Sequence, residues 1–411
     1  MINSGDTAFV LFGSALVLLM TPGLAFFYGG MVRRKNVLSI LMQCFILMCL
    51  VGVQWVLFGY SLSFGPDIGH FIGSLKWLGL SGVGLEPNAD YAGSIPHQAF
   101  MVFQCMFAII TPALFIGAFA ERIKFSSFFI FVLLWSVLVY DAVAHWVWGA
   151  GGWLRNIGAL DFAGGTVVHI NAGISALALA ILIGKRRGFG TTLMAPHNLP
   201  FTVLGTGLLW FGWFGFNSAS ALSANGLAVN AFVTTNTATA SAGLTWALLE
   251  WILRGKPTML GCASGAVAGL VAITPACGFV SPLSSILIGL GAGVFCYLAV
   301  TRLKTEFGYD DSLDVFGVHC IGGIWGALAT GLFAQKAINE AGNNGLFFGN
   351  PKQFLIQALG VGATLLYALI LTTVIYFILD KLIGMRVEPE DEDVGLDLSQ
   401  HSESAYAGEA E

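Results

Sequence analysis

The chain has 411 residues, of which 56% are hydrophobic and only 10% are charged, with a formal net charge of −5 and a mean hydropathy of +0.80. Soluble domains carry about 25% charged residues, so this composition argues against a water-soluble fold and indicates the bilayer as solvent. The apolar segments are long and continuous, which argues against a transmembrane β-barrel. Seven cysteines without a CxxC pair indicate free core residues, not a disulfide or metal framework.

In chain order, the first seven residues carry one charge, Asp6, so we expect no cleavable signal peptide. Eleven apolar segments follow that are long enough to cross about 30 Å of hydrocarbon. They start near Thr7, Val37, His97, Phe125, Gly165, Leu199, Ala228, Met259, Pro282, Val315 and Phe354.

The loop charges test this count. Loops after odd-numbered segments hold fourteen of the 18 Lys and Arg residues, and the other loops hold only Lys76, Arg155, Lys336 and Lys352. By the positive-inside rule, the N-terminus lies outside and the C-terminus in the cytoplasm. The predicted fold is an all-α polytopic membrane protein with eleven transmembrane helices.

Two segments resemble each other at a separation of 150 residues. Asp161 pairs with Asp311, His169 with His319 and Gly173 with Gly323. Spans one to five (about 7–187) thus recur as spans six to ten (about 199–335), before an extra helix at about 353–384. Because each half contains an odd number of spans, the second half crosses the membrane in the opposite orientation. The functional sites of such inverted repeats lie near the midplane of the membrane. We expect one transmembrane domain, 1–386.

Each aspartate precedes its histidine by eight residues, a helical rise of about 12 Å. Because the two helices enter from opposite faces of a core about 30 Å thick, His169 and His319 should meet near its centre. Ionisable residues at this depth are functional by default. No third His, Cys or carboxylate lies at the same depth on these helices, which argues against a metal site. Neutral imidazoles suit ammonia, water or a proton.

Two further features allow two interpretations each. Asp161 is either an N-cap or a carboxylate that attracts a cation, and one residue can do both. Asp311 and Asp314 are equally ambiguous on the cytoplasmic side. Aromatic side chains are either an interfacial belt or a cation–π vestibule; they include Phe103, Phe107, Trp148, Trp210, Trp213, Phe214 and Phe216.

The chain resembles the ammonium transporter family (Amt/Mep/Rh), on the bacterial Amt side. The shared motifs include TPGLAFFYGG at 21–30, DFAGGTVVHIN at 161–171 and DVFGVH at 314–319. Further matching segments lie at 111–114, 117–122, 212–217 and 274–278. The resemblance extends over nearly the whole chain.

The resemblance implies a role for each site residue. Phe107, Trp148 and Ser220 would recruit ammonium, with Asp161 stabilising the site and assisting deprotonation. Phe107 and Phe216 would form a gate, and His169 and His319 would line the pore. Phe103, Trp213 and Thr274 would be pore neighbours. Asp141 has no counterpart, and we expect it to face a serine, a histidine such as His145, or a water-filled space.

The resemblance also implies a homotrimer in the bacterial inner (cytoplasmic) membrane, with a PII-type regulatory protein at the cytoplasmic face. Residues 387–411 carry nine acidic residues and no Lys or Arg. This cytoplasmic tail is either a disordered end or a docking segment. We expect no cofactor and no nucleic-acid partner. Because the sequence shows no nucleophile–base set, we do not expect an enzymatic activity.

Two rival functions remain. An Rh-type gas channel for ammonia or carbon dioxide would lack the aromatic recruitment site that Trp148 and Ser220 suggest. An ammonium sensor is expected to carry an appended signalling domain, and 25 residues follow position 386.

Overall fold

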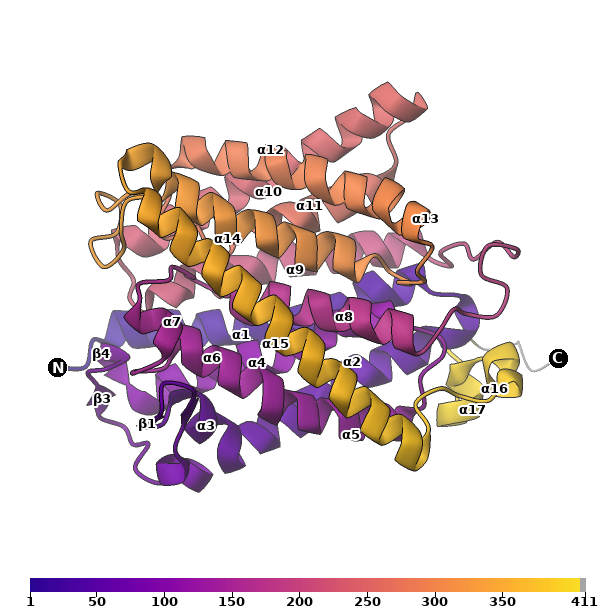
Figure 1. The fold of residues 1–411 in the computed structure, drawn as a ribbon, viewed down its shortest axis with the longest axis horizontal. Helices are drawn as coiled ribbons and strands as arrows, with labels where there is room; N and C mark the ends of the chain where they lie inside the picture. The colour runs from indigo at the N-terminus through magenta and orange to yellow at the C-terminus, as the bar shows by residue number, and fades with distance from the viewer. Residues whose placement is uncertain (407–411) are drawn as a thin grey trace.

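The computed structural model describes residues 1–406 as a bundle of long helices (Figure 1). The last five residues of the predicted acidic tail, Glu409 and Glu411 among them, lie outside the described residues. The helices of the first half are α1 (Ser4–Met31), α2 (Val37–Gln54), α3 (Tyr60–Phe64), α4 (His97–Phe115), α5 (Phe125–Trp135), α6 (Asp141–Trp148) and α8 (Asn171–Leu182), with the short α7 (Trp153–Asn156) between the last two.

The second half contains α9 (Leu199–Ser218), α10 (Gly226–Arg254), α11 (Met259–Ile273), α12 (Pro282–Leu298), α13 (Lys304–Phe307) and α14 (Ile321–Phe333), followed by α15 (Pro351–Ile383), α16 (Pro389–Val394) and α17 (Leu396–His401). Short π-helical turns join several of these helices or begin them: Trp55–Gly59, Ser136–Tyr140, Gly165–Ile170, Ala299–Leu303 and Phe316–Cys320. Single 3-10 turns lie at Arg34–Asn36, Leu75–Leu80, Ile116–Ala118, Ala219–Ala221 and Leu346–Phe348.

Every one of the eleven predicted segments is helical in the described chain and starts within three residues of its expected position. Nine are long and apolar enough to cross a membrane. α11 is apolar but has only 15 residues. α10 has 29 residues and is rich in Thr and Asn, several of which are buried toward its neighbours. The fold class is therefore all-α and multi-pass, while the span count and the orientation stay predictions.

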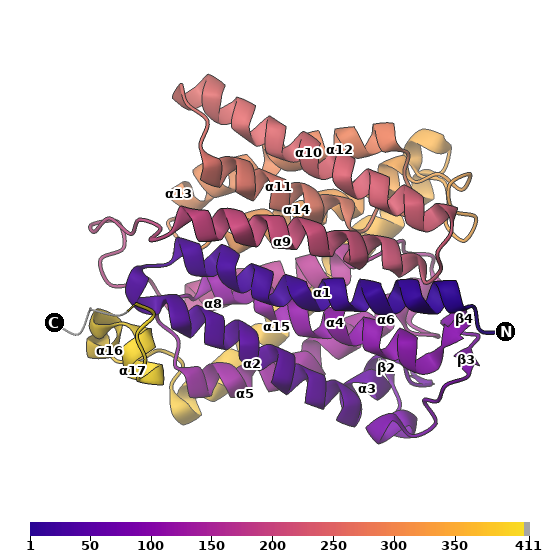
Figure 2. The ribbon, with the colours of Figure 1, turned by 180° about the vertical axis from the view of Figure 1, so that it is seen from behind.

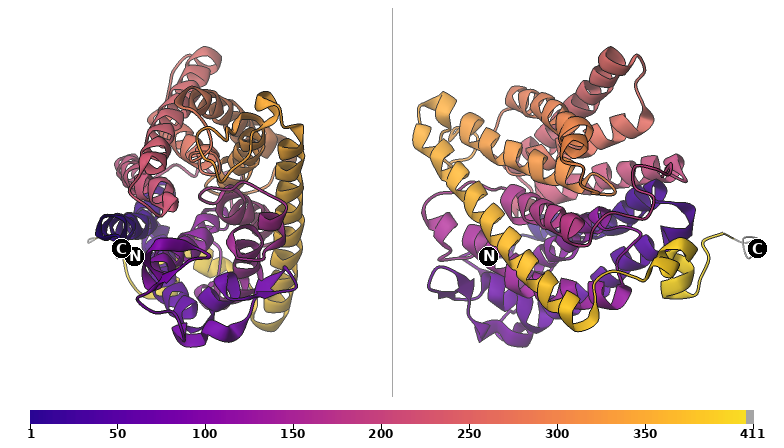
Figure 3. Two further views of the ribbon diagram at one scale, coloured as in Figure 1. Left: turned by 90° about the vertical axis from the view of Figure 1, so that its left-hand side faces the viewer. Right: turned by 45° about the vertical axis from the view of Figure 1, so that its right-hand side comes forward.

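The two chain ends lie at opposite ends of the bundle (Figure 1). We call these ends the N-terminal face and the C-terminal face. Viewed along the bundle, the helices of the first half lie on one side and those of the second half on the other, and α15 runs along one flank (Figure 3). This separation into two halves plus one extra helix agrees with the predicted repeat.

The two halves meet along α1 and α9, which lie side by side (Figure 2). Their close approach depends on glycine. A Cβ at Gly205 would lie 2.2 Å from the Phe27 backbone nitrogen, and one at Gly212 would lie 2.3 Å from Met20 Cγ. Small residues at such crossings allow the van der Waals packing on which helix association in membranes depends.

Two small hairpins cover the N-terminal face between α3 and α4. β1 (Asp67–Ile68) pairs antiparallel with β2 (Ile72–Gly73), and β3 (Pro87–Asn88) pairs antiparallel with β4 (Ala92–Pro96). They bring loop residues over the outer ends of α4 and α6.

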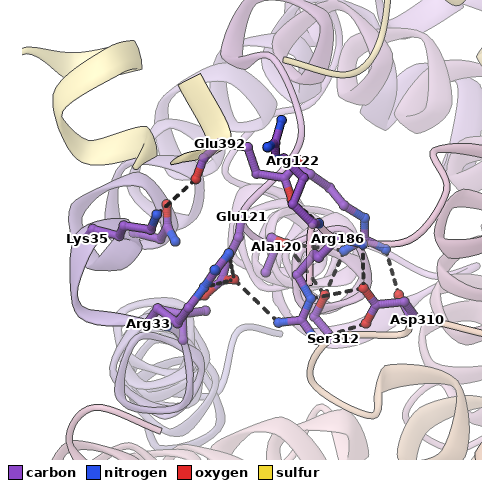
Figure 4. Close-up of polar contacts among 12 residues, drawn as sticks. Arg33, Lys35, Ala120, Glu121, Arg122, Arg186, Asp310, Ser312 and Glu392 are labelled. Atoms are coloured by element: carbon purple, nitrogen blue, oxygen red, sulfur yellow. Dashed lines mark hydrogen bonds and ion pairs between the residues drawn. The ribbon is translucent and has the colours of Figure 1, made fainter. Parts of the chain in front are cut away.

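A buried polar network closes the C-terminal face (Figure 4). Arg122 is fully buried and donates to the Asp310 carbonyl oxygen at 2.6 Å. Arg186 pairs with the Asp310 carboxylate at 2.9 Å, and Arg33 pairs with Glu121 at 2.7 Å. Arg186 holds the pKa of Asp310 below its ordinary value, although burial acts in the opposite direction. These contacts tie together loops from both halves.

The described part of the acidic tail is folded against this face (Figure 1). Glu392 accepts from the Arg187 N–H at 2.6 Å and pairs with Arg386 at 2.8 Å. Asp397 accepts from the Ser39 N–H at 2.8 Å. Up to residue 406 the tail is therefore ordered against the bundle, and its role as a docking segment stays a prediction.

Candidate functional site

Two histidines meet in the middle of the bundle, one from each half. His169 lies in the π-helical turn Gly165–Ile170, and His319 lies in the turn Phe316–Cys320. Their Nδ1 atoms are 3.3 Å apart, and their rings are nearly parallel, with centroids 5.4 Å apart and an interplanar angle of 21°. Both side chains are buried. The two imidazoles that the repeat pairs therefore lie in contact, each carried by a π-helical turn, a feature that often marks functional sites.

The contact constrains the protons of the pair. A hydrogen bond between two Nδ1 atoms needs one donor and one acceptor, so two neutral rings must be in different tautomers. The Nε2 atom of His169 is buried and has no hydrogen-bond partner among the described residues. Trp213 stacks on the His169 ring at a centroid distance of 5.3 Å. The pair therefore offers an unused polar atom beside an aromatic wall.

A narrow cavity runs past the two imidazoles. Its volume is about 10 Å³, close to the smallest space that holds one water-sized molecule. Its lining residues are Met20, Leu24, Ile110, Leu114, Val168, His169, Leu209, Trp213, Phe216, Val267 and His319. Among these residues only His169, Trp213 and His319 carry polar side-chain nitrogens, so the passage suits a small neutral solute.

A wider cavity of about 200 Å³ lies toward the N-terminal face. We call it the vestibule, and its lining residues are Asp90, Tyr91, Phe100, Gln104, Phe107, Val147, Trp148, Arg155, Phe162, Ser220 and Leu222. The structure thus brings Phe107, Trp148 and Ser220 together from three different helical segments. The sequence resemblance had grouped the same three residues.

Two phenylalanine rings stand between the vestibule and the narrow cavity. Phe107 lines the first cavity and Phe216 lines the second. Their ring centroids are 4.2 Å apart, with an interplanar angle of 35°. Trp148 meets Phe107 edge to face at 5.8 Å and 86°. The two tilted rings therefore lie between the two cavities.

Asp161 lies just behind the vestibule and does not line it. Its carboxyl oxygens accept from the N–H groups of Gly164 (2.8 Å), Gly165 (2.6 Å) and Thr166 (2.8 Å), and from the Thr166 hydroxyl. Burial raises the pKa of Asp161 above its ordinary value despite these donors. Its carbonyl oxygen accepts from Trp148 Nε1 at 2.9 Å. Asp161 therefore caps the segment that carries His169 and also holds the vestibule tryptophan.

The backbone at Gly164 explains the sharp start of this segment. Gly164 has φ +115°, and a Cβ there would lie 2.5 Å from Val168 Cγ2. Only glycine adopts this conformation without strain.

Two of the three remaining predicted neighbours, Phe103 and Thr274, support the site from outside it. Phe103 packs behind Phe107 at a centroid distance of 5.0 Å and lines neither cavity. Thr274 also lines neither cavity, but its hydroxyl accepts from Trp213 Nε1 at 2.9 Å. Ser220 lines the vestibule and donates to the Phe216 carbonyl oxygen at 2.8 Å. Of the three predicted neighbours, only Trp213 contacts the passage directly.

Sequence reasoning missed several vestibule residues. Gln104 lies three residues before Phe107 on the same face of α4, so helical spacing could have found it. Its Oε1 atom is buried without a hydrogen-bond partner among the described residues. Arg155 donates to the Trp148 carbonyl oxygen at 2.7 Å. Nothing in the sequence places Arg155 there, because its position depends on the fold of a loop.

Asp141 faces a serine, as one of the expected alternatives had it, but not His145. The Ser63 hydroxyl donates to Asp141 at 3.0 Å, and the Gln54 amide donates at 3.1 Å. The ring nitrogens of His145 lie instead against the Ser63 carbonyl oxygen and the Asp67 carboxylate, each at 2.9 Å.

Comparisons with known proteins agree over almost the entire chain. Residues 8–406 match the family described as "Ammonium Transporter Family". The ammonium transporter of Bacillus subtilis is 54% identical over 402 residues, 98% of each chain. Ammonium transporter Amt1 of Archaeoglobus fulgidus is 49% identical, covering 98% of this chain and 100% of that one.

Solved structures show the same similarity. The crystal structure of Saccharomyces cerevisiae Mep2 has a TM-score of 0.88 at 35% identity, covering 95% of this chain and 88% of that one. A structure titled "Sensor Amt Protein" has a TM-score of 0.89 at 31% identity, covering 97% and 98%.

Proposed function

The chain belongs to the ammonium transporter family, and on that premise we propose that it recruits ammonium in the vestibule, removes a proton and conducts ammonia between His169 and His319. The observation that carries this proposal is the contact between the two imidazoles beyond the two aromatic rings that lie between the cavities. The steps below follow the solute from the N-terminal face.

A charged solute needs help at the entrance. Transfer of a bare ammonium ion into an apolar medium costs tens of kcal/mol in a Born estimate. A cation over an aromatic face gains only about 0.5–2 kcal/mol. The rings of Phe107 and Trp148 can therefore select the cation at the vestibule but cannot carry it through the bundle. The proton must be removed before the narrow cavity.

Ser220 and Asp161 supply the polar part of recruitment. The Ser220 hydroxyl donates its hydrogen to the Phe216 carbonyl oxygen, so its lone pairs are free for an ammonium N–H. The Asp161 carboxyl acts through its field, because it is occupied by the N–H groups of its own helix. We infer that its negative charge stabilises the cation until deprotonation.

Beyond the Phe107–Phe216 gate, the solute is ammonia. The narrow cavity is apolar apart from the imidazoles and one indole, and ammonia can donate to, or accept from, a neutral imidazole. The unpartnered Nε2 of His169 is available for this contact. Potassium has no proton to lose and would retain its charge, so the same passage excludes it.

The proton released at the vestibule either returns outside or crosses separately along the histidine pair. Current measurements on purified protein in liposomes separate the two. If the proton crosses, an ammonium pulse produces a current that grows with ammonium concentration. Intact ammonia flux without any current would refute charge transfer and leave the gas-channel alternative.

The sensor alternative is supported by the structural likeness to the protein titled as a sensor. A dedicated sensor would bind ammonium in the vestibule without sustaining flux. Ammonium uptake into liposomes that saturates with concentration and exceeds protein-free leakage supports transport. Binding without uptake would favour sensing.

We propose a homotrimer in the cytoplasmic membrane, with the N-terminal face outside and a PII-type protein at the C-terminal face. The loop charges support this orientation. The docked tail, which lies on the C-terminal face, supports a regulatory surface there. Native mass spectrometry of the detergent-solubilised protein tests the trimer, and co-purification with a PII protein tests the partner.

A further inference from the structure

A chain of polar contacts outside the passage ties the first hairpin to α6, the helix that ends in Trp148. His145 Nε2 lies 2.9 Å from Asp67 Oδ1, and His145 Nδ1 lies 2.9 Å from the Ser63 carbonyl oxygen. The His145 side chain is fully buried, and that of Asp67 is 22% exposed. Neither residue lines the vestibule or the narrow cavity.

The acceptors around His145 determine how many protons the ring carries. A carbonyl oxygen only accepts, so Nδ1 must donate its hydrogen to Ser63. The other nitrogen, Nε2, then faces a carboxylate oxygen, which also only accepts when ionised. A hydrogen bond between these atoms therefore needs one more proton, so His145 and Asp67 form an imidazolium–carboxylate pair or share a proton between them. Removing Asp67 would leave the buried His145 ring without its carboxylate partner, which is destabilising locally. Asp67 is partly exposed and keeps His70 as a second partner when His145 is replaced.

The electrostatics of Asp67 fit this pairing. His145 holds the pKa of Asp67 below its ordinary value against the effect of burial, with help from the His70 backbone N–H at 3.1 Å. The His70 ring lies 3.3 Å from the same carboxylate but is largely exposed. His145 is therefore the buried partner of Asp67 and His70 the solvated one.

The chain that follows Trp148 wraps directly onto this pair. A Cβ at Gly149 would lie 2.4 Å from His145 Nδ1, and one at Gly151 would lie 2.6 Å from Asp67 Cβ. Gly151 has φ +95°, which an L side chain rarely adopts. The pair thus determines where the last turn of α6 ends and how the backbone leaves it.

Trp148 is the third residue after His145, on the next turn of the same helix. Its indole nitrogen is held by the Asp161 carbonyl oxygen at 2.9 Å, and its ring meets Phe107 at 86°. The Asp67–His145 pair packs against the backbone at Gly149 and Gly151, directly after Trp148. We propose that Asp67 and His145 are positioning residues of the ammonium vestibule, which set the angle of the Trp148 ring against Phe107; this inference rests on the proposed function.

Other contacts allow the pair to be changed without losing the fold. Trp146 Nε1 donates to the Phe71 carbonyl oxygen at 2.8 Å, and the Trp153 N–H donates to the His70 carbonyl oxygen at 3.2 Å. Asp141 holds Ser63 through a separate bond at 3.0 Å. Together these bonds keep the hairpin attached to α6 and its loop when Asp67 or His145 is replaced.

The test measures ammonium uptake into proteoliposomes as a function of concentration for Asp67→Asn and His145→Gln. We expect KM to rise about tenfold, equal to about 1.4 kcal/mol of lost binding, while Vmax stays within about twofold. The matched control is His70→Gln, which changes the exposed partner of the same carboxylate. It should retain the KM of the unmodified protein. Thermal melting in detergent accompanies each variant.

A second arm separates positioning from general structural damage. In a Trp148→Leu background the ring to be positioned is absent, so His145→Gln should add less than about twofold to KM. An additive effect in that background would overturn the inference, as would a loss of Vmax at constant KM in both single variants.

The two proposals fail differently. If the unmodified protein shows no saturable ammonium uptake, the proposed function is wrong. If it transports ammonium and both Asp67→Asn and His145→Gln keep its KM, only the positioning role is wrong.

Discussion

Asp161 and Asp311 occupy equivalent positions in the inverted repeat, eight residues before the two paired histidines, yet the structure holds them differently. Asp161 accepts three backbone N–H bonds of 2.6–2.8 Å and a hydroxyl. Asp311 accepts from the Phe316 N–H at 2.7 Å, and its buried Oδ1 has no hydrogen-bond partner among the described residues. The repeat preserves the course of the backbone, but the two carboxyls differ in the number of hydrogen bonds that they accept.

This difference in hydrogen bonding affects the protonation of the two carboxyls. Burial raises the pKa of Asp311 to about 6, with Lys304 acting to lower it and Asp314 to raise it. The other ionisable groups around it are Tyr28, Tyr309 and Arg122. Burial raises the pKa of both carboxyls, but several hydrogen-bond donors act to lower that of Asp161, whereas Asp311, with its pKa raised to about 6, changes its protonation state near that pH. Two carboxyls at equivalent positions of a repeat can therefore differ in their protonation.

The largest effect is expected from replacing His169 and His319, the two residues that the carboxyls flank. Replacing His169 and His319 together with alanine takes away every protonatable nitrogen that the imidazoles offer the narrow cavity. Selective transport should fall at least about 100-fold, the scale of positioned proton-transfer groups. Uptake in liposomes at equal ammonium and potassium concentrations measures it. A double variant that still transports ammonium and rejects potassium would show that the pair is wrongly assigned.

The second prediction compares the two carboxyls directly. A carboxylate about 8 Å from a cation, at an effective dielectric constant near 20, contributes about 2 kcal/mol. We therefore expect Asp161→Asn to reduce ammonium uptake about 30-fold at pH 7. Asp311→Asn should reduce it less than about threefold, because no cation is recruited at that end. Equal losses in the two variants would remove the functional asymmetry.

The third prediction concerns the protonation of Asp311. Because its pKa is raised to about 6, the carboxyl is neutral below that pH and ionised above it. A protonated-carboxyl band in the infrared difference spectrum should disappear as pH rises through about 6, and Asp311→Asn should lack it. Since the native state binds the extra proton, this group's contribution to stability declines as pH rises from about 4 to about 6. A band that titrates near pH 4 would contradict the assignment.

The smallest effect concerns the backbone at the two equivalent turns. Gly164 has φ +115° and Asp314 has φ +62°. The second value lies in the left-handed region that Asp and Asn tolerate, and the first does not. Gly164→Ala should cost about 1–3 kcal/mol, seen as a lower melting temperature in detergent. Asp314→Asn, the matched control, keeps a tolerated residue and should change stability by less than about 1 kcal/mol. Similar melting temperatures of the two variants would show that alanine at position 164 adopts this backbone conformation without strain.

Much of the fold followed from one-dimensional patterns. Every predicted helix start lies within three residues of an observed one, because apolar length and loop charge are properties of a segment and not of its neighbours. The meeting of His169 with His319 was predictable as well, since a repeat and a helical rise fix depth. Trp213 and Ser220 needed the family resemblance, because aromatic residues and serines are common at helix ends.

By itself, the sequence determined the membrane class and the helical segments, and it predicted the inverted repeat and the depth of the two histidines. Only the tertiary structure decided that Arg155 and Gln104 reach the vestibule, and that His145 pairs with Asp67 instead of Asp141. These contacts join residues that are distant in the chain or lie on irregular loops. Their geometry depends on how helices rotate and cross, which hydropathy and helical period leave open.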